Sequence, residues 1–229
     1  MSAAVGHNGL SAYQAVVGRR SVRRFRPTPV GDSVIDSILG AAARAPSGMN
    51  TQPWLVHVVT GAARERLSRT VRQAAEQGEE CVEYRYIPDP MKEPYLSRRR
   101  KLGFDLYALY GINRHDLEAR SQAYLRNYDF FGAPVGLFIT MERELLLGSW
   151  IDCGMFMQNI MTIARAFGLE TCPQQAWCDY GPIVHRELSM PDAHILLSGM
   201  ALGYADPFAP ENNLVSERAG TEVFAVRHR

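Results

Sequence analysis

The densest charge in this sequence lies in a short run of arginines near the N-terminus. Four of six consecutive residues are arginine and one is serine: Arg19, Arg20, Ser21, Arg23 and Arg24. Guanidinium groups hold phosphate oxygens through forked, charge-assisted hydrogen bonds, and a neighbouring hydroxyl adds one more donor. A solvated basic turn is the alternative interpretation. Because no acidic residue lies nearby in the sequence, the pattern favours a bound anion.

A second polar cluster occupies the segment 45–54. Its small donors and acceptors are Ser47, Asn50 and Gln52, which suit a heteroaromatic ring with alternating N–H and C=O groups. Gly48 permits close approach of the backbone to a ligand, and the tryptophan that ends the segment offers a flat wall. An ordinary loop with a core tryptophan is the alternative. Loops between a helix and a strand often hold ligands on a rigid frame.

Hydrophobic periodicity places the elements that must position these clusters. A short helix over Ala12–Gly18 leads into the arginine run. A second helix, capped by Asp32 or Ser33 and ended by Pro46, carries one apolar face formed by Val34, Ile35, Ile38, Leu39 and Ala42. The β-branched run Leu55–Thr60 predicts a strand. One amphipathic helix therefore separates the two polar clusters.

The remaining helices and strands alternate loosely. Helices are expected over Ala63–Gln77 and, after a break at 88–94, over most of the region up to residue 127. In this second region Leu102, Leu106 and Leu109 give an apolar stripe. Strands are expected over Val135–Met141 and Ile195–Leu202. Because the regular βαβ rhythm is missing, the sequence favours an α+β fold.

Two segments of the C-terminal half carry apolar residues that are expected to be buried in the core or against another subunit. The longest helix, Leu146–Phe167, is apolar almost throughout and ends at Gly168. Such a helix is expected to be buried on nearly all sides, in a core or between subunits. The tail 206–229 is polar and then apolar at Val223, Phe224 and Val226, which predicts an arm that docks as an edge strand.

Bulk composition excludes several classes of protein. A chain of 229 residues, 46% of them hydrophobic, can bury roughly 70% of its unfolded surface, so we expect one domain over 1–229. A net charge of +1 gives no global field for nucleic acid or a membrane surface. The cysteines form no CxxC pair and no histidine has metal-ligand spacing, so no metal is expected. The N-terminus lacks the pattern of a signal peptide, which favours a cytoplasmic protein.

Taken together, the two polar clusters resemble the opening motifs of the nitroreductase family of FMN-dependent oxidoreductases. The matching segments are Arg-Arg-Ser-Val-Arg at 19–23 and Ala-Pro-Ser-Gly-x-Asn-x-Gln-Pro-Trp at 45–54. Further matches follow in order at 131–135, 152–171 and 199–204. The resemblance implies a central, mostly antiparallel sheet flanked by helices. It also implies an intertwined homodimer with exchanged C-terminal arms and FMN at the interface.

The resemblance also implies a set of FMN contacts. Arg19, Arg20 and Ser21 would hold the phosphate and ribityl chain, and Arg23 would lie near flavin N1 and O2. Arg218 would be the last phosphate cation, with Arg227 as the alternative. The partner subunit would contribute Pro46, Ser47, Gly48, Asn50 and Gln52. One flavin face would pack on Pro173, Gln174 and Gln175, with a backbone N–H reaching N5.

These contacts imply a specific chemistry. A guanidinium near N1 and O2 stabilises negative charge on the reduced flavin, while the flavin itself carries the hydride. The sequence has no GxGxxG fingerprint, so NAD(P)H would visit the flavin in a ping-pong mechanism that reduces nitroaromatic or quinone acceptors. No general acid is obvious, and protons could come from water. The alternatives are a reductive dehalogenase, a flavin-fragmenting enzyme and a non-catalytic flavin-binding protein.

The segment 88–131 corresponds to the variable lid of this family. Its aromatic residues are candidate substrate contacts, with core packing as the alternative: Tyr107, Tyr110, Phe130 and Phe131. The basic run Arg98–Lys101 is either a solvated helix face or a contact for the 2′-phosphate of NADPH. The second interpretation favours NADPH over NADH as electron donor.

Overall fold

The computed structural model describes residues 9–79 and 81–229. Its centre is a four-stranded sheet in the order β1-β2-β4-β3, in which all neighbours are antiparallel. The strands are β1 (Leu55–Thr60), β2 (Val135–Glu142), β3 (Glu170–Gln174) and β4 (His194–Gly203). The α+β class and three of the strands are confirmed. The sequence did not predict β3, which is short and polar and contains a proline that only an edge strand tolerates.

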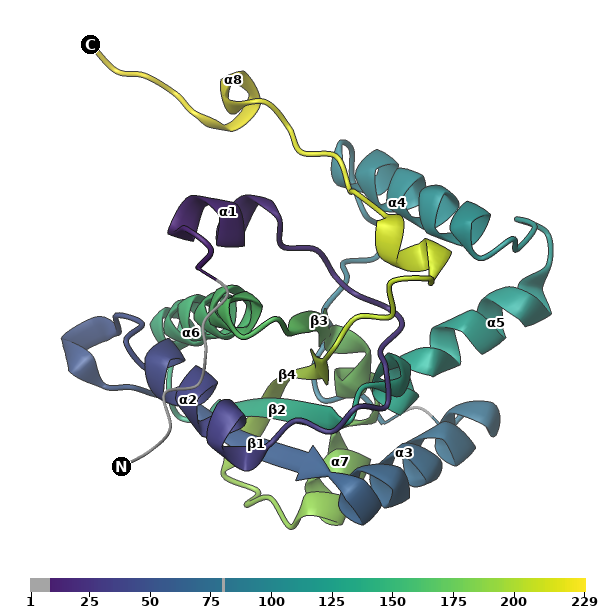
Figure 1. Cartoon of the computed structure of the whole chain (residues 1–229), viewed down its shortest axis with the longest axis horizontal. Helices are drawn as coiled ribbons and strands as arrows, with labels where there is room; N and C mark the ends of the chain where they lie inside the picture. Colours follow the sequence, from purple (N-terminus) through teal and green to yellow (C-terminus); the bar gives the residue numbers. More distant parts are fainter. Residues whose placement is uncertain (1–8, 80) are drawn as a thin grey trace.

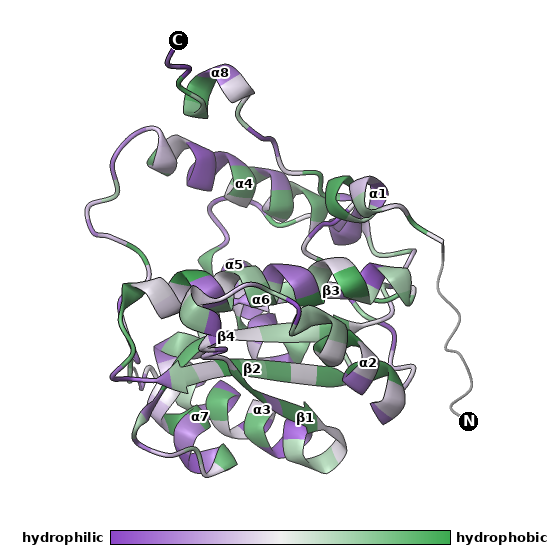
Figure 2. Cartoon of the chain, turned by 90° about the vertical axis from the view of Figure 1, so that its left-hand side faces the viewer, coloured by the Kyte–Doolittle hydropathy of each residue, from purple (hydrophilic) through white to green (hydrophobic). Residues whose placement is uncertain are grey.

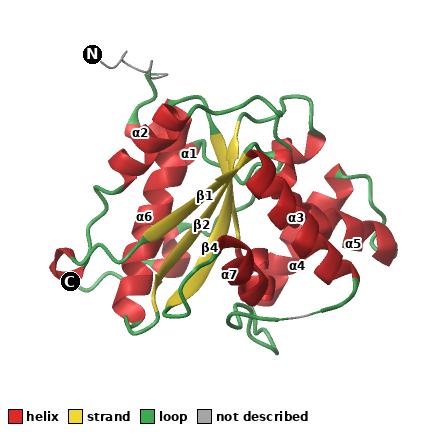
Figure 3. Cartoon of the chain, turned by 90° about the horizontal axis from the view of Figure 1, so that it is seen from below, coloured by secondary structure: helices red, strands yellow, loops and turns green. Residues whose placement is uncertain are grey.

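Helices cover both faces of this sheet (Figure 3). On one face lie α2 (Asp32–Ala42) and α6 (Leu147–Ala166), and on the other lie α3 (Gly61–Glu76) and α7 (Gly181–Leu188). The other helices of the described residues are α1 (Ala12–Val17), α4 (Tyr95–Leu109), α5 (Leu117–Leu125) and α8 (Thr221–Phe224). The 3₁₀ turns are η1 (Gly48–Asn50), η2 (Arg126–Gly132), η3 (Gln175–Tyr180) and η4 (Pro210–Asn213). α4 and α5 lie outside the sheet layers (Figure 1).

Alternating side chains of β2 divide the core into two halves. Leu137 and Ile139 belong to the cluster beneath α2 and α6, whereas Phe138 belongs to the cluster beneath α3 and α7. Successive residues of a strand point to opposite faces of the sheet. Because both faces of the sheet are covered, the sequences of β1, β2 and β4 are largely apolar, and β1 and β2 are coloured mainly as hydrophobic in Figure 2.

Within one chain, α6 is buried along one side only. Cys153, Phe156 and Ile160 face the core, whereas Leu147 and Ile151 are 79% and 67% exposed. The chain's own core therefore does not bury this helix on nearly all sides, and the exposed apolar side is free to meet another subunit. Gly168, with φ +72°, ends the helix as expected.

The outer segments agree only in part with the sequence prediction. The helix predicted after the break at 88–94 is present as α4, which has no buried residue. The tail forms no strand in the described residues. Instead, Thr221–Phe224 form a short helix, α8, and Phe224 is 69% exposed. The tail extends away from the body of the protein (Figure 1).

Among the described residues, no helix has the length and apolar character needed to span a membrane.

Candidate functional site

The arginine run lies beside β3 at the edge of the sheet. Ser21 forms a parallel bridge with Thr171, and the Val22 amide donates a hydrogen bond to the Thr171 carbonyl at 3.1 Å. Because side chains alternate along an extended segment, Val22 is buried in the core while Ser21 and Arg23, on either side of it, line a cavity. The sheet edge therefore fixes the backbone that carries the arginines.

This cavity, which we call the cationic cavity, has a volume of about 720 Å³. Three segments that are distant in sequence bound it. The N-terminal segment contributes Arg19, Arg20, Ser21 and Arg23; α4 contributes Arg98, Arg99 and Lys101; and the C-terminal segment contributes Glu217 and Arg218. Arg227, the alternative to Arg218, is not among its lining residues.

The cationic cavity holds more positive than negative charge. Lys101 pairs with Asp105 and Glu217, at 2.8 and 3.2 Å. In the part of the chain that the structure describes, Arg19, Arg20, Arg23 and Arg218 form no ion pair with a carboxylate. Burial and the nearby charge of Arg218 lower the pKa of Arg19. The lining residues thus carry more positive than negative charge, so the cavity is suited to an anion such as a phosphate group.

A smaller cavity, the aromatic cavity, meets the cationic cavity at Arg23. It has a volume of about 210 Å³, and its walls include Tyr107, Tyr110, Phe131, Cys172 and Pro173. Burial raises the pKa of the Cys172 thiol, so this sulfur is no nucleophile at neutral pH. Arg23 lines both cavities, which makes it the link between an anion site and a flat, aromatic-walled site.

The structure separates two adjacent phenylalanines that the sequence grouped as substrate contacts. Phe130 and Phe131 both adopt left-handed backbone angles, with φ of 51° and 55°. This turn directs Phe130 into the core, where it is 0% exposed and packs against Phe138 and Trp177. Phe131 lines the aromatic cavity. We therefore withdraw Phe130 as a substrate contact, because a ligand has no access to its ring.

The side chains of Gln174 and Gln175 are bonded inside the protein. Gln174 Nε2 donates to the Asn127 carbonyl at 2.7 Å, and Gln175 Nε2 donates to the Tyr84 hydroxyl at 2.7 Å. These bonds hold the end of β3, next to Pro173 in the wall of the aromatic cavity. The Nε2 groups of both amides are thus occupied by internal bonds, whereas Gln174 Oε1 is buried without a hydrogen-bond partner.

The second polar cluster, at 46–52, lies apart from both cavities and close to the start of α6. The Gly48 amide donates to Asp152 Oδ2 at 3.1 Å, and the Gln52 amide donates to Ser47 Oγ at 3.0 Å. Asn50 and Gln52 adopt φ of 60° and 50°, so the loop is a tight turn. None of the residues that line the two cavities comes from this loop.

The two cavities fit the two ends of FMN. A phosphate requires unpaired cations, which the cationic cavity supplies. A flat ring with a polar edge requires aromatic walls and a donor at one side, which the aromatic cavity and Arg23 supply. The loop at 46–52 carries the further donors expected for the ring but lies elsewhere on the chain, beside the exposed side of α6.

Comparisons with known proteins show the family of the chain. Residues 16–204 match the model of the nitroreductase family. The chain is 40% identical to the nitrobenzene nitroreductase of Ectopseudomonas oleovorans, over 91% of this chain and 92% of that protein. It is 38% identical to the 4-nitrobenzoate reductase of Pseudomonas putida, over 93% of each.

A solved structure extends the likeness to the whole fold. The FMN and NADPH-dependent nitroreductase NfnB of Sphigopyxis sp. strain HMH superposes with a TM-score of 0.93 at 38% identity, covering 96% of this chain and 100% of that one. The chain therefore belongs to the nitroreductase family.

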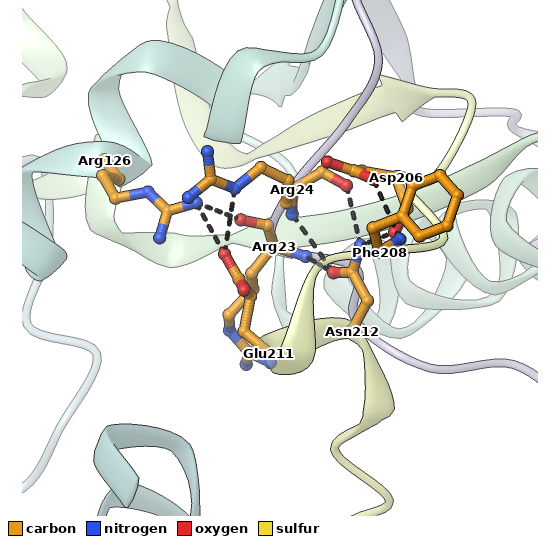
Figure 4. Close-up of polar contacts among 7 residues, drawn as sticks. All are labelled: Arg23, Arg24, Arg126, Asp206, Phe208, Glu211 and Asn212. Atoms are coloured by element: carbon orange, nitrogen blue, oxygen red, sulfur yellow. Dashed lines mark hydrogen bonds and ion pairs between the residues drawn. The ribbon is translucent and has the colours of Figure 1, made fainter. Parts of the chain in front are cut away.

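Sequence reasoning missed the residues that hold the arginine run from behind. Arg126, Glu211 and Asn212 bond to the backbone or side chains of Arg23 and Arg24 (Figure 4). The only signal in the sequence was an acidic residue next to a proline, Pro210-Glu211, in a polar tail. Such a pattern is too common to indicate a role.

Proposed function

We propose that this protein reduces nitroaromatic compounds with electrons from NADPH, using bound FMN. The observation that carries the proposal is the position of Arg23, which lines both the cationic and the aromatic cavity. The relatives named above support the substrate class, since they are named for nitrobenzene and 4-nitrobenzoate. The solved neighbour supports the cofactor and the electron donor.

Each cavity residue then has a binding role. Arg19, Arg20, Ser21 and Arg218 bind the FMN phosphate and the chain next to it. Arg23 donates to the polar edge of the ring at N1 and O2, and Pro173 packs on one face of the ring. Tyr107, Tyr110 and Phe131 form the walls against which an aromatic substrate stacks.

We propose that the active form is a homodimer, in which each FMN is bound by both subunits. The exposed apolar side of α6 and the tail with Phe224 supply surface for such an interface. The loop 46–52 is tied to the start of α6 through Gly48 and Asp152. A partner packed on α6 would bring its Ser47, Asn50 and Gln52 to the flavin ring, where this chain alone offers none of them.

Bound FMN supplies the hydride chemistry, taking electrons from NADPH and passing them to the nitro group. The protein's own contribution is electrostatic. The fixed guanidinium of Arg23 stabilises negative charge that develops at the N1 and O2 edge, and its effect is strong because the site is partly buried. No carboxylate or histidine is among the described residues that line the aromatic cavity, which is consistent with protons that come from water.

The basic face of α4 favours NADPH over NADH. Arg98 and Arg99 line the cationic cavity, and Arg99 also lines a neighbouring cavity of about 890 Å³ together with Tyr107. Lys101 is occupied by Asp105 and Glu217, which leaves the two arginines as contacts for a second phosphate. Their proposed ligand is the 2′-phosphate of NADPH.

Initial-rate kinetics test the proposed activity. NADPH oxidation should require a nitroaromatic, and double-reciprocal plots at several acceptor concentrations should be parallel, because donor and acceptor use the same site in turn. Intersecting lines would contradict the shared site. Turnover of halophenols in place of nitroaromatics would instead identify a reductive dehalogenase, and FMN that NADPH cannot reduce would identify a binding protein.

A further inference from the structure

The backbone at Arg23 and Arg24 is held by side chains rather than by a neighbouring strand. On one side of this pair, Val22 bonds to β3, and on the other side Phe25 and Arg26 bond to the carbonyls of Phe131 and Tyr204. Between these points no strand pairs with the chain. The backbone N–H and C=O groups of the two arginines instead form hydrogen bonds with the side chains of Asn212 and Arg126 and with the Asp206 amide (Figure 4).

The Asn212 side chain alone forms most of the hydrogen bonds of this backbone segment. Its Oδ1 accepts from the amides of Arg23 and Arg24, at 2.8 and 3.2 Å. Its Nδ2 donates to the carbonyls of Arg24 and Asp206, at 2.8 and 2.9 Å. An asparagine side chain offers two acceptor and two donor positions, and here all four are used. The side chain is buried, so these bonds are protected from water.

Glu211, the residue before Asn212, supplies the negative charge behind the arginine run. It is 2% exposed, and its Oε1 accepts from Arg24 Nε at 3.2 Å and from an Arg126 terminal nitrogen at 3.0 Å. That same nitrogen of Arg126 donates to the Arg23 carbonyl at 2.7 Å. Glu211 therefore neutralises Arg24 and Arg126 and fixes the backbone of Arg23 through Arg126.

Glu211 pairs with Arg24 and Arg126, and Arg23 has no carboxylate partner among the described residues. Its guanidinium makes only a 3.2 Å hydrogen bond to the Ser21 carbonyl among the contacts of the described residues. Arg23 is thus rigid in its backbone and unneutralised in its side chain, at the junction of the two cavities. A preorganised charge of this kind stabilises developing negative charge without reorganisation at the moment of reaction.

We propose that Glu211 and Asn212 are positioning residues that aim Arg23 at the reducible ring of FMN and so raise the affinity for reduced over oxidised flavin. The proposal rests on the function proposed above. It predicts that loosening this clamp weakens binding of reduced FMN more than binding of oxidised FMN. A merely structural role would weaken both equally.

The reduction potential of the bound FMN measures this difference directly. Glu211→Gln and Asn212→Asp keep the side-chain shape; the first removes the charge and the second removes both donors. We expect each to favour oxidised flavin about tenfold more than wild type does, which makes the two-electron potential about 30 mV more negative. Asn213→Ala and Glu222→Gln are matched controls, because both side chains are exposed nearby in the chain, and both should keep the wild-type potential.

The flavin-free protein offers a second readout that does not depend on activity. Hydrogen exchange of the segment 21–26 should be about tenfold faster in Asn212→Ala than in Asn213→Ala, because the amides of Arg23 and Arg24 lose their acceptor. If Asn212→Ala does not fold, the reduction potentials of the Glu211→Gln and Asn212→Asp proteins remain the test, since both substitutions keep the shape of the side chain.

Two results would overturn the proposal. One is an unchanged potential in Glu211→Gln and Asn212→Asp proteins that still bind FMN. The other is a loss of affinity by the same factor for oxidised and reduced FMN. A wild-type protein that binds no FMN would refute the proposed function itself. This outcome differs from failure of the positioning proposal, in which wild type binds FMN and the variants have the wild-type potential.

Discussion

Arg19 and Arg218 line one cavity although they come from opposite ends of the chain. Burial of Arg19 and the charge of Arg218 together lower the pKa of Arg19. Arg19 is partly buried and Arg218 is exposed, and the two like charges repel each other unless an anion lies between them. The repulsion is acceptable in a site whose ligand is a phosphate, so the pair indicates that the cavity is built for an anion.

Arg19→Ala should weaken FMN binding. Each charge-assisted hydrogen bond contributes about 1.5–3 kcal/mol, so the dissociation constant should rise on the order of 10- to 100-fold. Quenching of FMN fluorescence on titration into flavin-free protein measures the change. Arg26→Ala is the control, since Arg26 is exposed and does not line the cavity. Equal FMN affinity in the Arg19→Ala protein and wild type would refute the phosphate role of this residue.

A charge on the exposed side of α6 should prevent dimerisation. Ile151→Glu places a carboxylate on an apolar surface that we assign to the subunit interface, where an unpaired charge is costly to bury. We expect a monomer by light scattering after size-exclusion chromatography, with loss of bound FMN. Leu117→Glu on α5, at a residue 72% exposed, is the matched control and should stay dimeric. A dimeric Ile151→Glu protein would place the interface elsewhere.

Glu211 should make stability depend on pH in the acid range. Burial raises its pKa, but its own backbone amide and the bonds from Arg126 and Arg24 outweigh burial, so the pKa lies below its ordinary value. A carboxylate with a lowered folded-state pKa stabilises the fold above the unfolded-state pKa, about 4.3. That stabilisation is lost as pH falls through the folded-state value.

The Glu211→Gln protein tests this dependence. At pH 7 its free energy of unfolding should be lower than that of wild type by about 1–3 kcal/mol. The difference should stay constant down to about pH 5 and shrink at lower pH, as measured by urea unfolding at a series of pH values. An equal difference at pH 7 and pH 3 would mean that the charge of Glu211 does not stabilise the fold.

Gly199 should tolerate no side chain. A Cβ at this position of β4 would overlap the indole ring of Trp177, which is fully buried. Gly199→Ala should therefore lower the free energy of unfolding by about 1–3 kcal/mol through overpacking. Gly40→Ala in α2 has open space around it and should instead stabilise the protein by about 0.5–1 kcal/mol. Urea unfolding of both variants measures the contrast, and equal effects would contradict the packing described for Trp177.

Sequence reasoning predicted the elements whose stability is local or strongly patterned. The strand at Leu55–Thr60 and the helix that ends at Gly168 follow from apolar runs and a terminating glycine. β3 was not predicted, because Cys172 and Pro173 gain strand geometry only by pairing with β4. The tail forms no strand in the described chain, since a strand requires a neighbouring backbone and apolar residues alone do not supply one; an arm docked on a partner subunit stays a prediction.

The candidate site shows the same limit. Arg23 and the residues around it could be named because their types and spacing carry information locally. Glu211 and Asn212 could not, because their partners lie across the fold and only the structure brings them together. Phe130 and Phe131 are adjacent residues of the same type. Only the left-handed turn that they form decides which of the two side chains reaches the cavity.

The central claim is that FMN bound at Arg23 carries electrons from NADPH to a nitroaromatic compound. It is tested most directly by the absorbance spectrum of the FMN-loaded protein without oxygen, recorded before and after one equivalent of NADPH and again after a nitroaromatic is added. Our account predicts that the yellow colour bleaches with NADPH and returns with the nitroaromatic. A flavin that stays oxidised with NADPH, or stays reduced when the nitroaromatic is present, would contradict it.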